Sequence, residues 1–158
     1  MAPSVDELLS FFDETRFLPS LRARSKAGVL KELAGAFAED PDIRHQEVLL
    51  EALTAREKLG STGIGKEVAI PHSRTLSVPN LKALVARSKS GVAWGAPDKK
   101  SVKLFFVVVA PPQDRANLYL PLLGALVSAV QAKGSRDALL SAEDWGGMRS
   151  ALEEALRG

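Results

Sequence analysis

The chain has 158 residues, 46% of them hydrophobic and 25% charged, which is the composition of an ordinary globular domain of this length. Its net charge of +2 is far below the concentrated positive charge of a dedicated nucleic-acid-binding protein. The sequence has no cysteine, which excludes disulfides, thiolate metal sites and cysteine nucleophiles and is typical of a reducing compartment. We therefore predict a single domain over residues 1–158, located in the cytoplasm and without a nucleic-acid partner.

The sequence gives no indication of export or of a membrane segment. Its first twenty residues lack the charged-then-apolar order of a secretory leader. The longest apolar run, from Leu104 to Pro112, is about half as long as a membrane span. We therefore expect neither secretion nor membrane insertion.

The first sixty residues predict three helices and one short strand. Apolar residues at helical spacing, bounded by capping or helix-ending residues, place the helices at residues 4–12, 25–39 and 42–59. Ser4 and Glu7 form a capping box for the first helix, and Ser25 caps the second. Residues 17–21 are apolar but contain Pro19, which restricts a strand here to the edge of a sheet.

From Val68 onward the pattern changes to short apolar runs bounded by Gly, Pro, Asn and Asp, which is typical of strands. We place strands at residues 68–70, 83–86 and 102–110. The last run is almost continuously apolar after Lys103, as expected for a central strand covered on both faces. Helices are predicted over residues 116–133, shortly after Ser135, and over residues 142–156. This order predicts one α/β domain with a mixed sheet between helical layers.

The segment between residues 56 and 74 carries most of the chemical information. It contains Gly60-x-x-x-x-Gly65-Lys66, which is the skeleton of a nucleotide-binding P-loop. Two features exclude that interpretation. Glu67 stands where a P-loop needs Ser or Thr for magnesium, and the predicted order is helix, loop, strand instead of strand, loop, helix.

The glycines at positions 60, 63 and 65 have two interpretations. They let the chain turn sharply between a helix and a strand, since glycine adopts left-handed conformations without steric cost. The loop also leaves backbone N–H groups free beside two arginines, and this combination suits an anion such as phosphate.

His72 is the candidate nucleophile of this segment. A neutral imidazole attacks phosphorus readily, and a phosphoryl group on nitrogen remains transferable to another acceptor. Pro71 fixes the backbone before the ring, and Arg56 and Arg74 are placed to neutralise phosphoryl oxygens. Further phosphate-binding residues are expected among the neighbouring donors, namely Ser61, Thr62, Gly63 and Ser73.

The alternative for His72 is an ordinary surface or hydrogen-bonded histidine at the end of a strand. The other histidine, His45, lies between Arg44 and Glu47 in a stretch that reads as a solvated helix face. With no cysteine and no His-x-x-x-His spacing, the sequence predicts neither a metal site nor another cofactor.

Residues 55–65 (Ala-Arg-Glu-Lys-Leu-Gly-Ser-Thr-Gly-Ile-Gly), followed by Ala69-Ile70-Pro71-His72, resemble the signature of a known family. This family is the enzyme IIA domain of the bacterial phosphoenolpyruvate-dependent phosphotransferase system, of the fructose/mannitol type and especially its nitrogen-regulatory branch. Ser25-Lys26 and Ala110-Pro111-Pro112 also occur in the family's order. The resemblance covers most of the chain and is weakest in the first twenty residues and after Lys133.

The resemblance implies a three-layer α/β/α fold around a small mixed sheet. It implies that His72 accepts a phosphoryl group from an HPr-type phosphocarrier protein, that Arg56 is the family's arginine beside this histidine, and that a transporter or a sensor is a further protein partner. The family has a second histidine, in a His-Leu pair at the start of the helix after the long apolar strand. The corresponding pair here is Asn117-Leu118.

This departure leaves two functions open. In the first, His72 is a working phosphoryl relay and Asn117 replaces the second imidazole as a hydrogen-bonding group that contacts the phosphate. In the second, the domain is a regulatory binding module in which phosphotransfer is weakened or lost. Asn117 also has a structural interpretation, because asparagine is a favoured helix cap. Since the chain has no membrane segment it cannot move sugar alone, which favours the regulatory branch.

Overall fold

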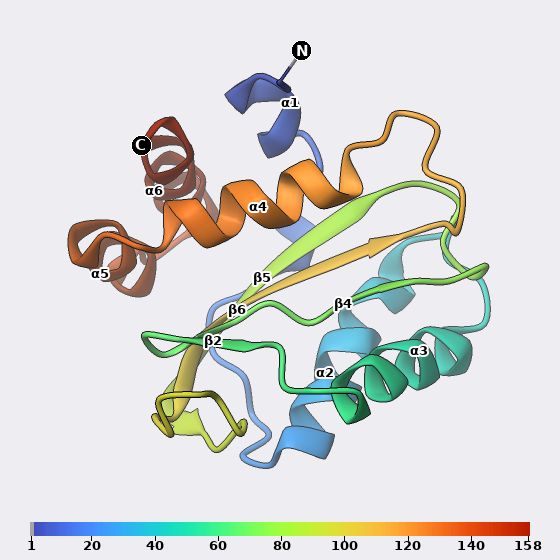
Figure 1. Ribbon diagram of the computed structural model, residues 1–158, viewed down its shortest axis with the longest axis horizontal. Helices are drawn as coiled ribbons and strands as arrows, with labels where there is room; N and C mark the ends of the chain where they lie inside the picture. The colour runs from blue at the N-terminus through green and yellow to red at the C-terminus, as the bar shows by residue number, and fades with distance from the viewer. Residues whose placement is uncertain (1) are drawn as a thin grey trace.

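A mixed sheet of six strands forms the centre of the fold in the computed structural model, which describes residues 2–158 (Figure 1). Five strands follow the order β1-β5-β6-β3-β2, and β4 also pairs with β6. β6 is antiparallel to β5 and parallel to β3 and β4. The strands are β1 (Phe17–Leu18), β2 (Gly63–Gly65), β3 (Val68–Ala69), β4 (His72–Arg74), β5 (Lys82–Val92) and β6 (Val102–Ala110). The short β1 lies at the sheet edge, as predicted from Pro19, which directly follows it.

β6 is the central strand expected from its continuous apolar run. All of its residues except Lys103 are buried. Successive side chains point to opposite faces, so Phe106 and Val108 join the apolar cluster on one face, and Phe105 and Val107 join the cluster on the other. A strand covered on both faces needs apolar residues at every position, which explains the loss of alternation in its sequence.

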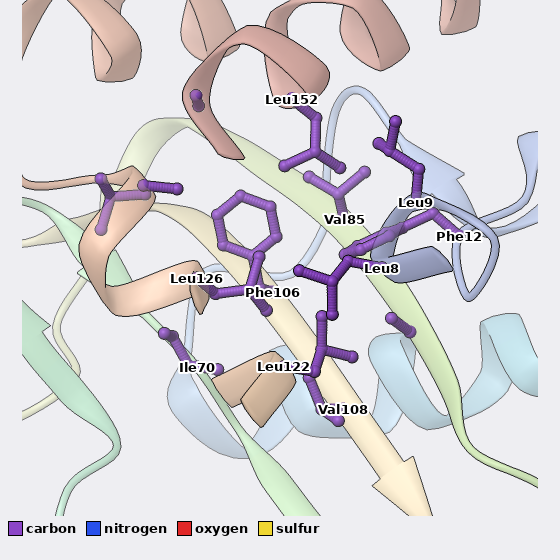
Figure 2. Close-up of a cluster of buried hydrophobic side chains, with 14 of the residues drawn as sticks. Leu8, Leu9, Phe12, Ile70, Val85, Phe106, Val108, Leu122, Leu126 and Leu152 are labelled. Atoms are coloured by element: carbon purple, nitrogen blue, oxygen red, sulfur yellow. The ribbon is translucent and has the colours of Figure 1, made fainter. Parts of the chain in front are cut away.

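Four helices cover one face of the sheet (Figure 1). They are α1 (Val5–Leu9), α4 (Tyr119–Ala129), α5 (Lys133–Ser141) and α6 (Trp145–Arg157). Figure 2 shows Phe106 of β6 among leucines from α1, α4 and α6, and the ring of Phe12 meets it edge-on with centroids 6.2 Å apart. α1 begins where predicted because Ser4 Oγ accepts a hydrogen bond from the backbone N–H of Glu7 at 3.1 Å.

Helices α2 (Lys26–Ala36) and α3 (Gln46–Lys58) cover the opposite face. Ser25 caps α2 as predicted, since its hydroxyl oxygen accepts from the N–H of Gly28 at 3.1 Å. Short 3₁₀ helices, η1 (Glu14–Arg16) and η2 (Phe37–Glu39), precede β1 and follow α2. A mixed sheet between two helical layers confirms the predicted three-layer α/β/α fold. None of the helices within residues 2–158 is both long and apolar enough to cross a membrane.

The start of α3 differs from the prediction, which placed it at Asp42. His45 precedes the helix with a left-handed φ of 53°, and the Asp40 carboxylate accepts from the N–H of Asp42 at 2.9 Å. These two features turn the chain before Gln46, so the helix begins there.

The start of α4 also differs, at Tyr119 instead of Ala116. The Asp114 carboxylate accepts from the backbone N–H groups of Leu118 and Tyr119, at 2.8 Å and 2.9 Å. Asn117 has a left-handed φ of 54° outside the helix. The interpretation of Asn117 as the helix cap is therefore wrong, because Asp114 caps this helix.

The other differences concern length and two unpredicted strands. β5 continues past residue 86 to Val92, α4 ends at Ala129, and α5 already begins at Lys133. β2 and β4 are short and depend on partners distant in sequence, so local patterning did not reveal them. Pro71, which has no N–H to donate, separates β3 from β4.

Candidate functional site

The glycine segment forms a tight antiparallel hairpin between β2 and β3. At its turn Lys66 and Glu67 have left-handed φ values of 58° and 66°, which a type I′ hairpin turn requires at both central positions. A Cβ atom at Gly63 would lie 2.8 Å from the Cβ of Ala96, so only glycine permits this close approach. The N–H of Gly63 donates to Ser61 Oγ at 3.1 Å. The hairpin thus supports the interpretation of the glycines as turn and close-approach residues.

A buried carboxylate, Glu57, lies behind the hairpin and is only 7% exposed. It accepts hydrogen bonds from the backbone N–H of Thr62, at 2.9 Å, and from the Thr62 hydroxyl, and it pairs with Lys26 Nζ at 2.8 Å. The Trp94 indole N–H donates to Thr62 Oγ1 at 3.1 Å, and the Trp94 carbonyl accepts from Lys26 at 2.8 Å. Both donors of Thr62 are therefore engaged by Glu57, which ties the end of α3 to the hairpin.

We expect Glu57→Gln to lower the free energy of unfolding by about 2 to 3 kcal/mol. Removing one member of a buried ion pair costs about 3–5 kcal/mol, and the partial exposure of Lys26 reduces that cost. Urea unfolding measures the change, with Glu51→Gln on the exposed side of α3 as a matched control expected within about 0.5 kcal/mol of the unchanged protein. Equal stability of the two variants would contradict a structural role for the ion pair.

His72 is the first residue of β4, and its half-buried ring is held in one tautomer. Its Nδ1 lies 2.7 Å from the carbonyl oxygen of Ile70, and because a carbonyl oxygen only accepts, Nδ1 carries the hydrogen. The lone pair of the ring is therefore on Nε2. The ring presents Nε2 as its nucleophilic atom.

Arg56, from the last turn of α3, joins this ring to the glycine segment. Its Nε donates toward His72 Nε2 at 3.4 Å, and its Nη1 donates to the carbonyl of Gly60 at 2.9 Å. The fold thus brings together a nucleophile and a fixed positive charge that lie 16 residues apart in sequence. The guanidinium is held from two sides, which orients it before any ligand arrives.

Burial lowers the pKa of His72 below its ordinary value; the charge of Arg56 adds to this, while the Ile70 hydrogen bond and Glu57 oppose it. With a lowered pKa the imidazole is neutral at pH 7 and takes up a proton only when the pH falls below about 6.5.

An NMR titration should therefore give His72 a midpoint below 6.5, with the resonance assigned by its loss in His72→Ala. A midpoint above 6.5 would contradict burial as the dominant influence.

A pocket of about 160 Å³ opens beside His72. Arg56, Ser61, Thr62 and His72 line its polar side, and Ile64, Ile70, Leu123 and Val127 line its apolar side. Pockets for drug-sized ligands usually occupy about 300–1,000 Å³. The pocket therefore suits a group of phosphoryl size better than a whole sugar.

Ser73 and Arg74 follow His72 on β4 and lie outside this pocket. The Ser73 hydroxyl donates to the carbonyl of Arg74 at 3.3 Å. The exposed Arg74 guanidinium stacks on the ring of Tyr119, 4.7 Å from its centroid. Since alternate residues of a strand share a face, Arg74 and His72 are on the same face of β4.

Asn117 does not take the predicted place beside His72. It is exposed and lines a neighbouring cavity of about 500 Å³ that also includes Arg74 and Tyr119, and within residues 2–158 no hydrogen bond or ring contact joins it to His72. The ring of Tyr119 lies there instead, with centroids 6.2 Å apart. The sequence contains a signal for this residue. Tyr119 is followed by Leu120 in the same way as Asn117 is followed by Leu118, so both pairs match the family's pair at its second position.

His45 lies at the opposite end of α3 from Arg56. Its side chain is largely exposed, with Nδ1 3.6 Å from a carboxylate oxygen of Glu47. Within residues 2–158 no group of three or more His, Asp or Glu side chains is arranged to hold a metal ion.

Known proteins resemble this chain over most of its length. A nitrogen regulatory protein of Pseudomonas aeruginosa is 33% identical over 80% of this chain and 82% of its own length. A PTS system fructose-specific EIIA component of Haloferax volcanii is 29% identical over 84% of this chain and 85% of its own. The chain matches only 19% of the length of a fructose-specific EIIABC component of Bacillus subtilis, at 31% identity.

Solved structures give the same relationship. The nitrogen regulatory protein IIA-Ntr of Neisseria meningitidis superposes with a TM-score of 0.84 and 28% identity, covering 92% of this chain and 98% of that one. IIA mannitol of Escherichia coli superposes with a TM-score of 0.74 at 17% identity, a likeness of fold alone. The family model described as "Phosphoenolpyruvate-dependent sugar phosphotransferase system, EIIA 2" matches residues 10–155, and the chain belongs to this family.

Proposed function

We propose that this protein accepts a phosphoryl group on Nε2 of His72 from an HPr-type phosphocarrier and acts through a further protein partner, a transporter or a sensor. The observation that carries the proposal is the tautomer of His72. Ile70 holds the hydrogen on Nδ1, so the lone pair on Nε2 faces Arg56 at the pocket. Membership of the IIA family supports a phosphocarrier or regulatory role.

The proposed step exchanges one nitrogen–phosphorus bond for another. The Nε2 lone pair of His72 attacks the phosphorus of a phosphohistidine on the carrier, and the bond from phosphorus to the carrier's imidazole breaks. His72 then carries a positive charge shared over its ring, which the Ile70 carbonyl stabilises through Nδ1–H. Arg56 stabilises the negative charge on the phosphoryl oxygens during transfer.

The predicted phosphate-binding residues take different parts in this proposal. Ser61 lines the pocket and can turn its hydroxyl from the Trp94 carbonyl, 3.2 Å away, to a phosphoryl oxygen. Thr62 and Gly63 hold the hairpin, because their N–H groups already have acceptors within the protein. Arg74 and Ser73 lie at the edge of the site, where Arg74 supplies positive charge.

The surroundings of His72 fit a protein partner better than a free sugar. The pocket is small, and its apolar wall continues to side chains that are unusually exposed for their type. Val127 is 38% exposed and Leu120, on the same helix, is 65% exposed. Exposed apolar side chains around a polar centre are typical of protein docking surfaces.

One observation favours the second candidate, a binding module without phosphotransfer. The ring beside His72 is the phenol of Tyr119, and within residues 2–158 the other imidazole, His45, lies at the far end of α3. A relay with a single imidazole is chemically sufficient, since only Nε2 of His72 takes part in the bond exchange. We therefore place the relay first.

Mass measurement separates the two candidates. The protein is mixed with phosphoenolpyruvate, enzyme I and an HPr-type carrier, and omission of enzyme I is the control. We expect one added phosphoryl group that appears only in the complete mixture. An unchanged mass in the complete mixture, with the carrier itself phosphorylated, would support the binding module and contradict the relay.

A further inference from the structure

Three side chains from two elements lie together at the entrance of the site. His72 and Arg74 come from β4, and Tyr119 is the first residue of α4. The Tyr119 ring lies 6.2 Å from the His72 ring at an interplanar angle of 60°, and the Arg74 guanidinium lies 4.7 Å from the Tyr119 centroid. The phenol ring therefore contacts both the His72 ring and the Arg74 guanidinium.

The backbone of Tyr119 is fixed before any ligand binds. Asp114 accepts from its N–H and from that of Leu118, which sets the start of α4, and Leu122 one turn later is fully buried in the core. Tyr119 itself is only 6% exposed. A ring held in this way loses little conformational freedom when it makes a new contact.

The hydroxyl of Tyr119 is available as a donor. Burial raises the pKa of Tyr119 to about 12, against the charges of Arg74 and Arg56, which lower it. The hydroxyl thus keeps its proton at neutral pH and lies within the field of both arginines. Within residues 2–158 it makes no hydrogen bond, although the buried polar side-chain atoms of this region have partners.

We propose that Tyr119 binds the phosphoryl group of phosphorylated His72, donating a hydrogen bond from its hydroxyl while the Arg74 guanidinium stacks on its ring. This inference rests on the proposed function and assigns a third phosphate-binding group to the site, beside Arg56 and Ser61. It also gives the site a donor that stays neutral at pH 7. No bond to Tyr119 forms or breaks in the transfer.

Three single variants test this assignment. Tyr119→Phe keeps the ring and removes the donor, and Tyr119→His replaces the donor with an imidazole N–H. Asn117→His places the same imidazole on the loop before α4 and is the matched control. Each protein is phosphorylated with phosphoramidate, which needs no protein partner, and the rate of labelling at His72 is measured.

We expect Tyr119→Phe to be labelled about 10-fold more slowly, the effect of losing one hydrogen bond to a charged group. Tyr119→His should recover part of that rate, and Asn117→His should match the unchanged protein. The NMR midpoint of His72 in Tyr119→Phe should stay below 6.5, which shows that the ring still holds the imidazole.

Labelling of Tyr119→Phe at the full rate would overturn the assignment to Tyr119 and leave the relay intact. A larger change in labelling rate in Asn117→His than in Tyr119→His would also overturn the assignment. The loop before α4 would then contribute to phosphoryl binding. Failure of the unchanged protein to be labelled at His72 would instead overturn the proposed function together with this inference.

Discussion

Replacement of His72 by alanine is expected to abolish phosphorylation by the carrier while leaving the fold intact. The side chain supplies the only imidazole lone pair at the pocket, and the Thr62 hydroxyl there is held between the Glu57 carboxylate and the Trp94 indole N–H. The ring is half-buried and serves chemistry more than packing, so the free energy of unfolding should change by less than about 1 kcal/mol. The label on the unchanged protein should be lost in acid and stable in base, as expected for a nitrogen–phosphorus bond.

His45→Asn is the matched control, because it removes the other imidazole of the chain. Asparagine tolerates the left-handed φ of 53° at this position, so the start of α3 should be preserved. We expect its labelling to equal that of the unchanged protein. Persistent labelling of His72→Ala, or loss of labelling in His45→Asn, would place the phosphorylated residue elsewhere.

Arg56→Lys is expected to slow phosphorylation by about 10- to 1000-fold with little change in melting temperature. The planar guanidinium donates toward His72 Nε2 and to the Gly60 carbonyl at once, and a lysine ammonium cannot reproduce this fork. Loss of one fixed donor to the charge that develops in the transition state typically reduces a rate by about 100- to 1000-fold, and the retained positive charge of lysine offsets part of this.

The competing interpretation of Arg56 is a cation that only stabilises the end of α3. Such an interaction contributes less than about 1 kcal/mol and would affect stability without affecting rate. Lys58→Ala is the control for this interpretation, since Lys58 lies in the same last turn and is exposed. Equal rates for Arg56→Lys and the unchanged protein in single-turnover measurements would favour the helix-end interpretation.

The fold was predictable wherever local sequence and packing agree. β6 was predictable because a strand buried on both faces must be apolar throughout. The helix caps at Ser4 and Ser25 are recognisable from adjacent residues. The short β2 and β4 were missed because their pairing partners lie far away in sequence. The start of α3 was missed because the left-handed His45 depends on turns that the hydrophobic pattern does not encode.

The candidate site was also predictable from the sequence only in part. His72 and Arg56 were predicted as site residues because their side-chain chemistry is specific, and the structure places the two side chains together. Glu57 was missed, since a glutamate at the end of a helix ordinarily faces water, and only the tertiary contact with Thr62 and Lys26 reveals its burial. Tyr119 was missed because the cap of α4 comes from Asp114, which shifts the start of the helix and brings a different residue to the imidazole.

The most direct test of the central claim is the identity of the nitrogen that carries the phosphoryl group. The protein is labelled with ¹⁵N-histidine, phosphorylated with enzyme I and the carrier, and studied by NMR for coupling between phosphorus and the imidazole nitrogens. The structure leads us to expect coupling to Nε2 of His72, with Nδ1 still protonated against the Ile70 carbonyl. Coupling to Nδ1, or phosphorus on any residue other than His72, would contradict the account.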